Sequence, residues 1–296
     1  MSYLDTVTHT LFGMTLYGSL NKEEDSKNMK KALLFTSIAG SQIPDIDVIS
    51  KLWDTEGMYQ MWHRGITHSL FLVPLWALLL TIFCVYVFKV KNYQRLFIVS
   101  TVAVFIHNTS DLFNAWGTGY FEPFSSIRIT FGTIPIVDFI FWIIMFAAMI
   151  GTRFTKKNRY NLFRVAWVLI GLHITIQSIQ GYLFYQKYSE QYEQVALSAS
   201  FLPWNYTVIG KNAETIDLLD VSLLKEPILQ QTLQSQENAD LEELFAQRPE
   251  AKTLYDWSPF VVIVDDDERL GIYDPRFFRN GQSFLFEWIE KEAQSP

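Results

Sequence analysis

The chain has 296 residues, 49% of them hydrophobic and 16% aromatic, and a formal net charge of −7 at pH 7. This length and composition provide enough apolar material for two domains. Neither half of the chain is strongly basic, which excludes the electrostatic footprint of a nucleic-acid-binding protein. The single cysteine, Cys84, excludes a cysteine-based zinc site and an internal disulfide framework, and we expect it to be a small buried hydrophobe.

The charge is unevenly distributed along the chain. Residues 1–186 hold 15 Lys and Arg against 11 Asp and Glu, which gives +4, whereas residues 187–296 hold 9 against 20, which gives −11. Apolar segments are concentrated in the first part. We therefore predict a membrane-embedded helical domain over residues 1–186, which holds the metal site described below, and an acidic domain over residues 187–296.

The first elements expected are two short apolar helices, Leu4–Leu20 and Ala32–Ile43, with a charged loop over residues 21–31. The N-terminus lacks the basic start and cleavage site of a signal peptide, so we expect it in the mature protein. Pro44 should end the second helix and place Asp45 and Asp47 in a loop. Both helices are short for complete membrane spans, and an interfacial or re-entrant course is an open alternative.

Four longer apolar segments follow, and we predict that they span a membrane because a bilayer core requires about 20 apolar residues. They are Ser69–Val90, Leu96–Phe113, Ile134–Gly151 and Leu162–Tyr185. The predicted fold class is a mainly α membrane protein: a polytopic helical bundle of four clear spans plus the two short N-terminal helices, followed by a small β-rich α+β soluble domain.

The distribution of Lys and Arg in the connecting loops predicts the orientation. If all six segments cross, the loops 21–31, 89–95 and 153–164 share one side and carry 4+3+5=12 basic residues, whereas 44–68 and 114–133 carry 2+1=3. The first three loops should be cytoplasmic. The site residues described below and the C-terminal domain should then be extracytoplasmic.

The C-terminal part contains short β-branched and aromatic runs bounded by Gly, Pro and Asp, which are typical of strands. These runs are WNYTVIG, PFVVIVDDD, RLGIYD and QSFLFEW, and a helix is expected at 239–246. The three consecutive acids at 265–267 resemble a calcium cluster only loosely. A hairpin turn between VVIV and RLGIY explains them better, since Asp favours turns.

Imidazoles and carboxylates recur at the edges of the apolar segments. Four of the five histidines lie beside an acid or another histidine. The candidate metal ligands are Asp5, His9, Asp45, Asp47, His63, His68, His107 and Asp111. By parity and charge counting these positions all face one membrane surface, which is independent support for a common site.

These ligand types predict a divalent metal, because His and Asp together favour Zn²⁺ or Mn²⁺ over Ca²⁺. Eight groups exceed the needs of one ion, so we expect two or more ions with bridging carboxylates, an arrangement suited to phosphoester hydrolysis. The residues predicted to be catalytic are His63, His68 and Asp111. Arg64 and Ser69 flank the histidines and are predicted to hold a phosphate oxygen of the substrate.

Simpler interpretations apply to each residue alone. An isolated Asp is usually a helix cap or a solvated loop residue, and His107 with Asp111 would make a structural hydrogen-bonded pair. For Arg64 an interfacial anchor is favoured over a phosphate ligand. Four further polar residues are interpreted as packing residues or as supports for the ligands: Asp138, His173, Gln177 and Gln180.

Together the motifs D-x-x-T-H, P-D-x-D, H-R-G-x-T-H-S and H-x-x-x-D, in this order among apolar segments, resemble the YdjM-type family of predicted membrane-bound metal-dependent hydrolases. The resemblance covers about residues 1–186. It implies that the eight candidate ligands are the metal-site residues. It also implies a metal-dependent hydrolase, with phospholipase-like activity suspected for the family. As the substrate of this membrane protein we favour a lipid or other membrane-associated phosphoester.

Two other function classes remain open from the sequence. A divalent-metal transporter would place its ligands near the middle of the bilayer, between broken helices, whereas these ligands gather at one surface. A membrane-anchored regulatory protein would use the metal only as a structural element. The sequence indicates the lipid bilayer as a partner and no nucleic acid, and it identifies no protein partner.

Overall fold

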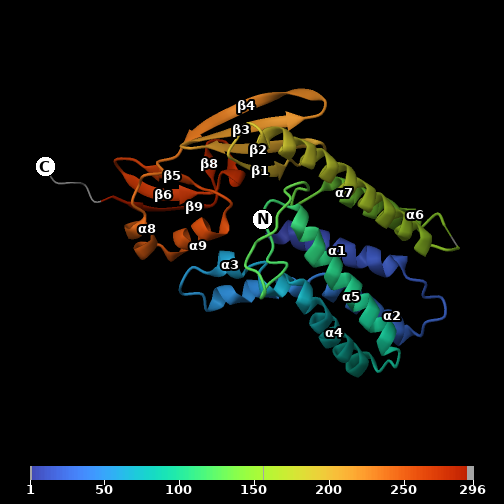
Figure 1. The fold of residues 1–296 in the computed structure, drawn as a ribbon. Coiled ribbons are helices and arrows are strands. Elements are labelled where there is room, and N and C mark those ends of the chain that lie inside the picture. The colour runs from blue at the N-terminus through green and yellow to red at the C-terminus, as the bar shows by residue number, and fades with distance from the viewer. Residues whose placement is uncertain (1, 156, 292–296) are drawn as a thin grey trace. The chain divides into compact units, whose positions relative to one another are not determined.

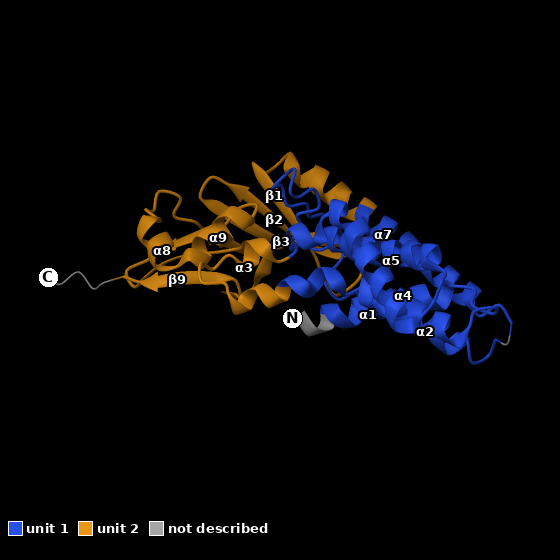
Figure 2. Cartoon of the chain, turned by 90° about the horizontal axis from the view of Figure 1, so that it is seen from below, with its two compact units in different colours: residues 1–47, 64–178 blue, residues 48–63, 179–296 orange. Residues whose placement is uncertain are grey.

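The computed structural model describes residues 2–155 and 157–291 of the chain. It divides into two compact units, which Figure 2 distinguishes by colour: unit 1 contains residues 1–47 and 64–178, and unit 2 contains residues 48–63 and 179–296. Each unit has its own buried apolar clusters. The division into domains at residue 187 stays a prediction.

Unit 1 is helical (Figure 1). Its main helices, including the one that continues into unit 2, are α1 (Ser2–Ser19), α2 (Lys27–Gly40), α4 (Val73–Phe88), α5 (Tyr93–Ser110), α6 (Phe139–Gly151) and α7 (Tyr160–Ser189). Short 3₁₀ helices connect them: η1 (Ile43–Leu52, which also continues into unit 2), η2 (Ile66–His68), η3 (Leu70–Leu72) and η4 (Asp111–Phe113).

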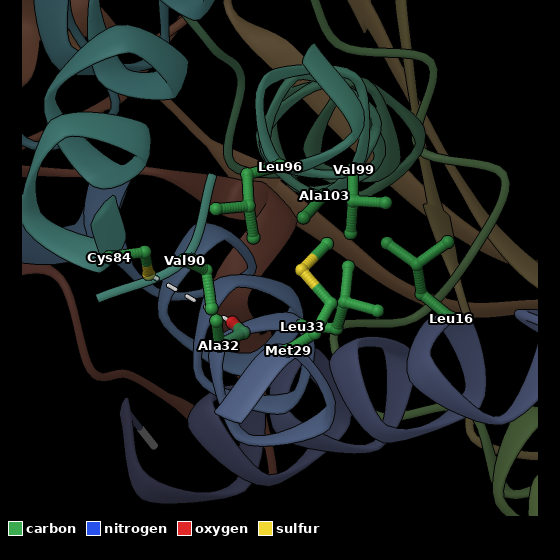
Figure 3. Packing of buried hydrophobic residues seen from close by; sticks show 9 residues of the cluster. All are labelled: Leu16, Met29, Ala32, Leu33, Cys84, Val90, Leu96, Val99 and Ala103. Carbon is green, nitrogen blue, oxygen red and sulfur yellow. Dashed lines mark hydrogen bonds between the residues drawn. The ribbon is translucent and has the colours of Figure 1, made fainter. Parts of the chain in front are cut away.

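The core of unit 1 lies among α1, α2, α4 and α5. Figure 3 shows nine of its buried side chains, among them Leu96 and Val99 of α5 and Cys84 of α4. The prediction that Cys84 is buried is confirmed, and its thiol lies 3.1 Å from the hydroxyl of Thr36. Helices α1 and α2 approach closely at Gly13, where an added Cβ would lie 2.6 Å from the carbonyl oxygen of Ser37. Only glycine permits this approach.

Three helices in the described part of the chain are long and apolar enough to cross a membrane: Leu70–Phe88, Tyr93–Phe113 and Tyr160–Ser189. They correspond to three of the predicted spans, and the predicted count of four is not confirmed. In the segment predicted from Ile134, the helix begins only at Phe139 and has 13 residues. The reason is local, because the Asp138 side chain accepts hydrogen bonds from the N–H groups of Ile140 and Phe141 and so fixes the helix start.

Two N-terminal predictions need correction. Helix α2 begins at Lys27 rather than Ala32, because the Ser26 hydroxyl accepts a hydrogen bond from Met29 N and caps the helix within the segment predicted to be a loop. The acids after Pro44 lie on the 3₁₀ helix η1 instead of an open loop. Proline is compatible with the first turn of a helix, where its missing N–H has no intrahelical partner.

Unit 2 contains the predicted β-rich region. An antiparallel four-stranded sheet has the order β1 (Gln194–Ala199), β2 (Asn205–Asn212), β3 (Thr215–Ser222) and β4 (Lys225–Gln234). A three-stranded sheet has the order β5 (Val262–Asp265), β6 (Arg269–Tyr273) and β9 (Phe286–Glu290), and β7 (Phe278–Arg279) pairs with β8 (Gln282–Ser283). The remaining helices are α3 (Tyr59–Trp62), α8 (Glu242–Gln247), α9 (Pro249–Trp257) and η5 (Pro275–Phe277).

The predicted turn at residues 265–267 is confirmed, since Asp266 N donates to Arg269 O at 3.0 Å between β5 and β6. The helix expected at 239–246 begins later, at Glu242. Strand β4 was not predicted, because nearly all its side chains are exposed and its sequence lacks the apolar alternation of a half-buried strand.

Candidate metal centre

Seven of the eight predicted ligands converge within unit 1 at one end of the α4–α5 pair. His68 ends the short helix η2 that leads toward α4, and Asp111 follows the last residue of α5. Because α4 and α5 are joined by a short loop, the start of one and the end of the other lie at the same end of the pair. Asp5 and His9 are one helical turn apart on α1 and therefore share a face.

The first group of ligands consists of Asp45, His68, His107 and Asp111, and one ligand atom from each lies within 4.8 Å of all the others. The Nε2 atoms of His68 and His107 are 3.0 Å apart. His68 Nε2 also lies 3.3 Å from Asp45 Oδ1 and 3.5 Å from Asp111 Oδ2. Two imidazoles and two carboxylates thus face a common point, as the ligands of Zn²⁺ or Mn²⁺ do.

A second group, Asp5, His9 and Asp111, shares one carboxylate with the first. His9 Nε2 lies 3.2 Å from Asp5 Oδ1 and 3.4 Å from Asp111 Oδ1. Asp111 therefore directs Oδ1 toward His9 and Oδ2 toward His68. The rings of His9 and His107 stack with centroids 3.9 Å apart, so the two groups are adjacent.

Contacts outside these groups orient the histidines. His107 Nδ1 lies 2.8 Å from the carbonyl oxygen of Ser41. A carbonyl oxygen can only accept, so Nδ1 carries the proton and the neutral ring presents the Nε2 lone pair to the cluster. Asp47 Oδ2 lies 3.4 Å from His68 Nδ1 and accepts hydrogen bonds from Thr67 Oγ1 at 2.8 Å and Arg64 N at 3.0 Å.

Arg64 lies inside the cluster. Its side chain is 2% exposed, Nη2 donates to Asp5 Oδ2 at 2.5 Å, and Nε lies 3.2 Å from Asp111 Oδ2. The interpretation of Arg64 as an interfacial anchor is therefore wrong, because its ion pairs with the half-buried Asp5 and the buried Asp111 keep it from the surface. Its backbone φ of 58° is in the left-handed region, and Gly65 follows.

The chemistry of this donor set fits a cation. The cluster contains four carboxylates (Asp5, Asp45, Asp47 and Asp111) and one guanidinium, which gives a net charge of −3 when the histidines are neutral. The buried atoms Asp45 Oδ1 and both His9 ring nitrogens make no hydrogen bond of good geometry, although His9 Nε2 and Asp45 Oδ1 have ion-pair contacts within the cluster. Buried acceptors in this condition are costly unless a cation coordinates them.

The pKa shifts of two groups outside the spans show how strongly the carboxylates and imidazoles of the cluster interact. Burial alone would lower the pKa of His68, but its contacts with Asp111, Asp45 and Asp47 raise it well above the usual value. Burial alone would raise the pKa of Asp45, yet the imidazoles of His107 and His68 hold it well below its usual range. Without a metal the cluster therefore favours a proton on the His68 imidazole, and a bound cation would take the place of that proton.

The other predicted site residues have defined local roles. His63 belongs to unit 2, where its ring stacks on Tyr59 with centroids 5.3 Å apart, and its place in the metal site stays a prediction. Ser69 caps η3 by accepting from Phe71 N, and its hydroxyl donates to the carbonyl of Glu122. A substrate contact by Ser69 therefore also stays a prediction.

The residues interpreted as packing or support are buried. His173 Nε2 lies 2.9 Å from Asp138 Oδ2, so these two form a pair within unit 1. Gln180 donates to the carbonyl oxygen of Trp204 at 3.1 Å within unit 2. Gln177 is buried in α7.

Sequence reasoning missed three contributors to the centre. Thr67 lies within the H-R-G-x-T-H-S motif, and its position beside His68 was the available signal. Asn108 follows His107, is fully buried and donates to Ser69 O at 3.3 Å. The carbonyl of Ser41 left no signal, because any residue supplies a carbonyl.

Comparisons with known proteins agree with the extent of the helical region. A family model described as YdjM inner membrane protein matches residues 4–184. The chain is similar to the uncharacterized protein YfhP of Bacillus subtilis (strain 168), with 33% identity over 142 residues, 47% of this chain and 43% of that protein. The matched part thus spans less than half the length of this curated relative. No solved structure matches the chain.

Proposed function

We propose that this chain, which belongs to the YdjM inner membrane protein family, is a metal-dependent hydrolase that acts on a lipid or other phosphoester at the membrane surface. The observation that carries the proposal is the pair of ligand groups that share Asp111 inside a buried cluster with excess negative charge. Paired sites that share a carboxylate suit phosphoester hydrolysis, in which both the attacking and the leaving oxygen need stabilisation.

In this proposal Asp45, His68, His107 and Asp111 hold one ion, and Asp5, His9 and Asp111 hold a second. Bound Zn²⁺ or Mn²⁺ would lower the pKa of a coordinated water toward neutrality and so supply the nucleophile. The protein residues fix the donor atoms: Ser41 O selects the tautomer of His107. We propose that Asp47 orients His68 through Nδ1, in place of the ligand role predicted for it.

The predicted catalytic residues His63, His68 and Asp111 remain part of the proposal. Arg64 is proposed to contact a phosphate oxygen of the substrate, because its Nη1 has no hydrogen-bond partner although the side chain is buried. A planar guanidinium can contact a carboxylate and a phosphate at the same time through separate N–H groups. Its carboxylate partners hold it in position before substrate binds.

We further propose that the centre opens on the extracytoplasmic side. The loop between α4 and α5, at the opposite end of the pair, carries Lys89 and Lys91, and basic loops favour the cytoplasm. A fourth crossing would require α6 and the segment before it, because 13 helical residues extend only about 20 Å.

The second candidate is a membrane protein with a structural metal site. It is favoured by the burial of His68 and His107, each with no exposed surface, which restricts access of water and substrate. A divalent-metal transporter is less well supported, because the ligands lie at one end of the α4–α5 pair rather than midway along the helices.

The test uses full-length protein reconstituted in vesicles of mixed phospholipids. The metal is removed with a chelator and restored with Zn²⁺ or Mn²⁺, and products are followed by lipid mass spectrometry and release of water-soluble phosphate. The proposal expects turnover that depends on the restored metal and is lost in His68→Ala. Tight metal binding without turnover across lipid and soluble phosphoesters would instead support the structural site.

A further inference from the structure

A group of exposed apolar side chains lies at one end of the four-stranded sheet of unit 2. In a meander with the order β1-β2-β3-β4, the turns β1–β2 and β3–β4 lie at the same end. Residues 200–204 form the first of these hairpin tips and residues 223–224 the second. Their exposed residues, with exposed fractions, are Phe201 (55%), Leu202 (68%), Trp204 (47%), Leu223 (63%) and Leu224 (80%).

The two tips are neighbours in the sheet. Asn205, next to the first tip, pairs with Ser222, next to the second. No Asp, Glu, Lys, Arg or His occurs between Ala196 and Gly210. Five large apolar side chains in adjacent turns form a contiguous exposed surface of a kind that marks an interaction site.

The opposite end of the same sheet is charged. There the β2–β3 turn follows Lys211 and contains Glu214, and Lys211 forms an ion pair of 2.7 Å with Glu237. One sheet therefore has an apolar end and a charged end. This polarity matches a membrane interface better than it matches free solution on all sides.

The four-stranded sheet packs along the last turns of α7. These contacts show at which level of the helix the apolar end of the sheet lies. Tyr188 and Phe184 pack against buried residues of the sheet, and Gln180, a turn further back, donates to the carbonyl of Trp204. The sheet therefore extends from the C-terminal end of α7 toward the middle of that helix. The first tip lies beside Gln180, nine residues and about 14 Å along the helix axis before its end at Ser189.

That level lies within the span candidate Tyr160–Ser189. An exposed apolar stripe on this helix extends past Gln180, since Ile176, Ile179 and Leu183 are all exposed at helical spacing. Tyr182 and Tyr185 are also exposed at this end, as expected of residues near the headgroups. If α7 spans the membrane, the tips are beside a part of the helix whose exposed apolar side chains would contact lipid.

The backbone of the first tip tolerates such an environment. Ser200 N donates to Asn205 O at 2.9 Å, and Asn205 N donates to Leu202 O at 3.4 Å, so polar groups of the turn are paired internally. Unpaired backbone groups would be costly in lipid. Lys225 follows the second tip and has a side chain long enough to reach the headgroups.

We propose that the two hairpin tips insert into the bilayer interface beside α7 and anchor the sheet of unit 2 to the membrane. The occupant of this apolar surface is the acyl and headgroup region of the lipid. The inference requires α7 to span the membrane and does not depend on hydrolase activity.

The test uses the variants Leu202→Cys and Leu224→Cys, with Ala213→Cys in the β2–β3 turn as the matched control. Each full-length variant carries a nitroxide spin label and is reconstituted in phosphatidylcholine vesicles with a minority of phosphatidylglycerol. The wild-type protein, treated in the same way, serves as the control for background labelling of the buried Cys84. Power saturation compares collisions with oxygen, which concentrates in lipid, and with a polar nickel chelate, which stays in water.

The proposal expects a several-fold higher ratio of oxygen to nickel accessibility at Leu202 and Leu224 than at Ala213. Two results would overturn it. Equal ratios at all three positions would place the tips in water. Low accessibility to both reagents at the tips would show that protein, such as a second copy of the chain, covers them.

Discussion

The role proposed for Asp47 can be tested by the substitution Asp47→Asn. One oxygen of this carboxylate lies within reach of three donors: Thr67 Oγ1 at 2.8 Å, Arg64 N at 3.0 Å and His68 Nδ1 at 3.4 Å. The amide keeps the shape and one acceptor oxygen but removes the charge that holds the proton on His68 Nδ1. Loss of such an orienting contact typically lowers metal affinity about 10- to 100-fold, which corresponds to about 1.4–2.7 kcal/mol.

The assay is competition with a fluorescent zinc chelator in detergent, together with metal content by elemental mass spectrometry. A positioning role predicts that Asp47→Asn binds the same number of ions as the wild type with a dissociation constant raised by about one to two orders of magnitude. A ligand role predicts a smaller number of bound ions. Unchanged affinity and unchanged content would refute both.

Asp54→Asn is the matched control. The Asp54 carboxylate also accepts three hydrogen bonds, from the N–H groups of Glu56, Met58 and Tyr59, but none of these donors belongs to the metal cluster. We expect this variant to lose some local stability and to bind metal as the wild type does. A similar loss of affinity in both variants would indicate general destabilisation.

Three further predictions follow from the packing of unit 1. Arg64→Met leaves the carboxylates of Asp5 and Asp111 without their cation and should destabilise the metal-free protein by about 3–5 kcal/mol, because Asp111 is buried. Thermal unfolding in detergent should show a smaller loss of stability when Zn²⁺ is present, and an equal loss would argue against a cation site. Gly13→Ala forces a Cβ against Ser37 O and should cost about 1–3 kcal/mol, measured by the same unfolding assay, while an unchanged melting temperature would contradict the close approach of α1 and α2. Asp138→Asn weakens the cap of α6 and the pair with His173 and should lower stability by about 1 kcal/mol without changing the metal content, whereas loss of metal would make this pair part of the centre.

Hydropathy and motif spacing predicted much of the architecture. The long spans could be predicted because a helix in lipid needs a continuous run of apolar residues, and such a run is visible within a short stretch of sequence. The start of α6 could not be predicted, because Asp138 caps the helix from within a segment whose other residues are mostly apolar. Strand β4 could not be predicted because it is stabilised by backbone pairing with β3 rather than by burial of alternate side chains.

The same distinction applies to the metal centre. The ligand types at the ends of apolar segments predicted the convergence of His9, His68 and His107, because ionisable groups are rarely placed there without a function. The burial of Arg64 depends on acids 59 and 47 positions away along the chain, and no local pattern reveals such contacts. The orienting carbonyl of Ser41 is invisible in sequence for a more basic reason, since it belongs to the backbone.

The most direct test of the central claim is the metal content of detergent-purified protein by elemental mass spectrometry. The wild type should be compared with the double variant His68→Ala, His107→Ala and with His173→Ala, which removes the one histidine outside the predicted ligand set. We predict zinc or manganese in the wild type and in His173→Ala, and its loss in the double variant. No metal in the wild type after reloading, or equal metal in all three proteins, would contradict the account.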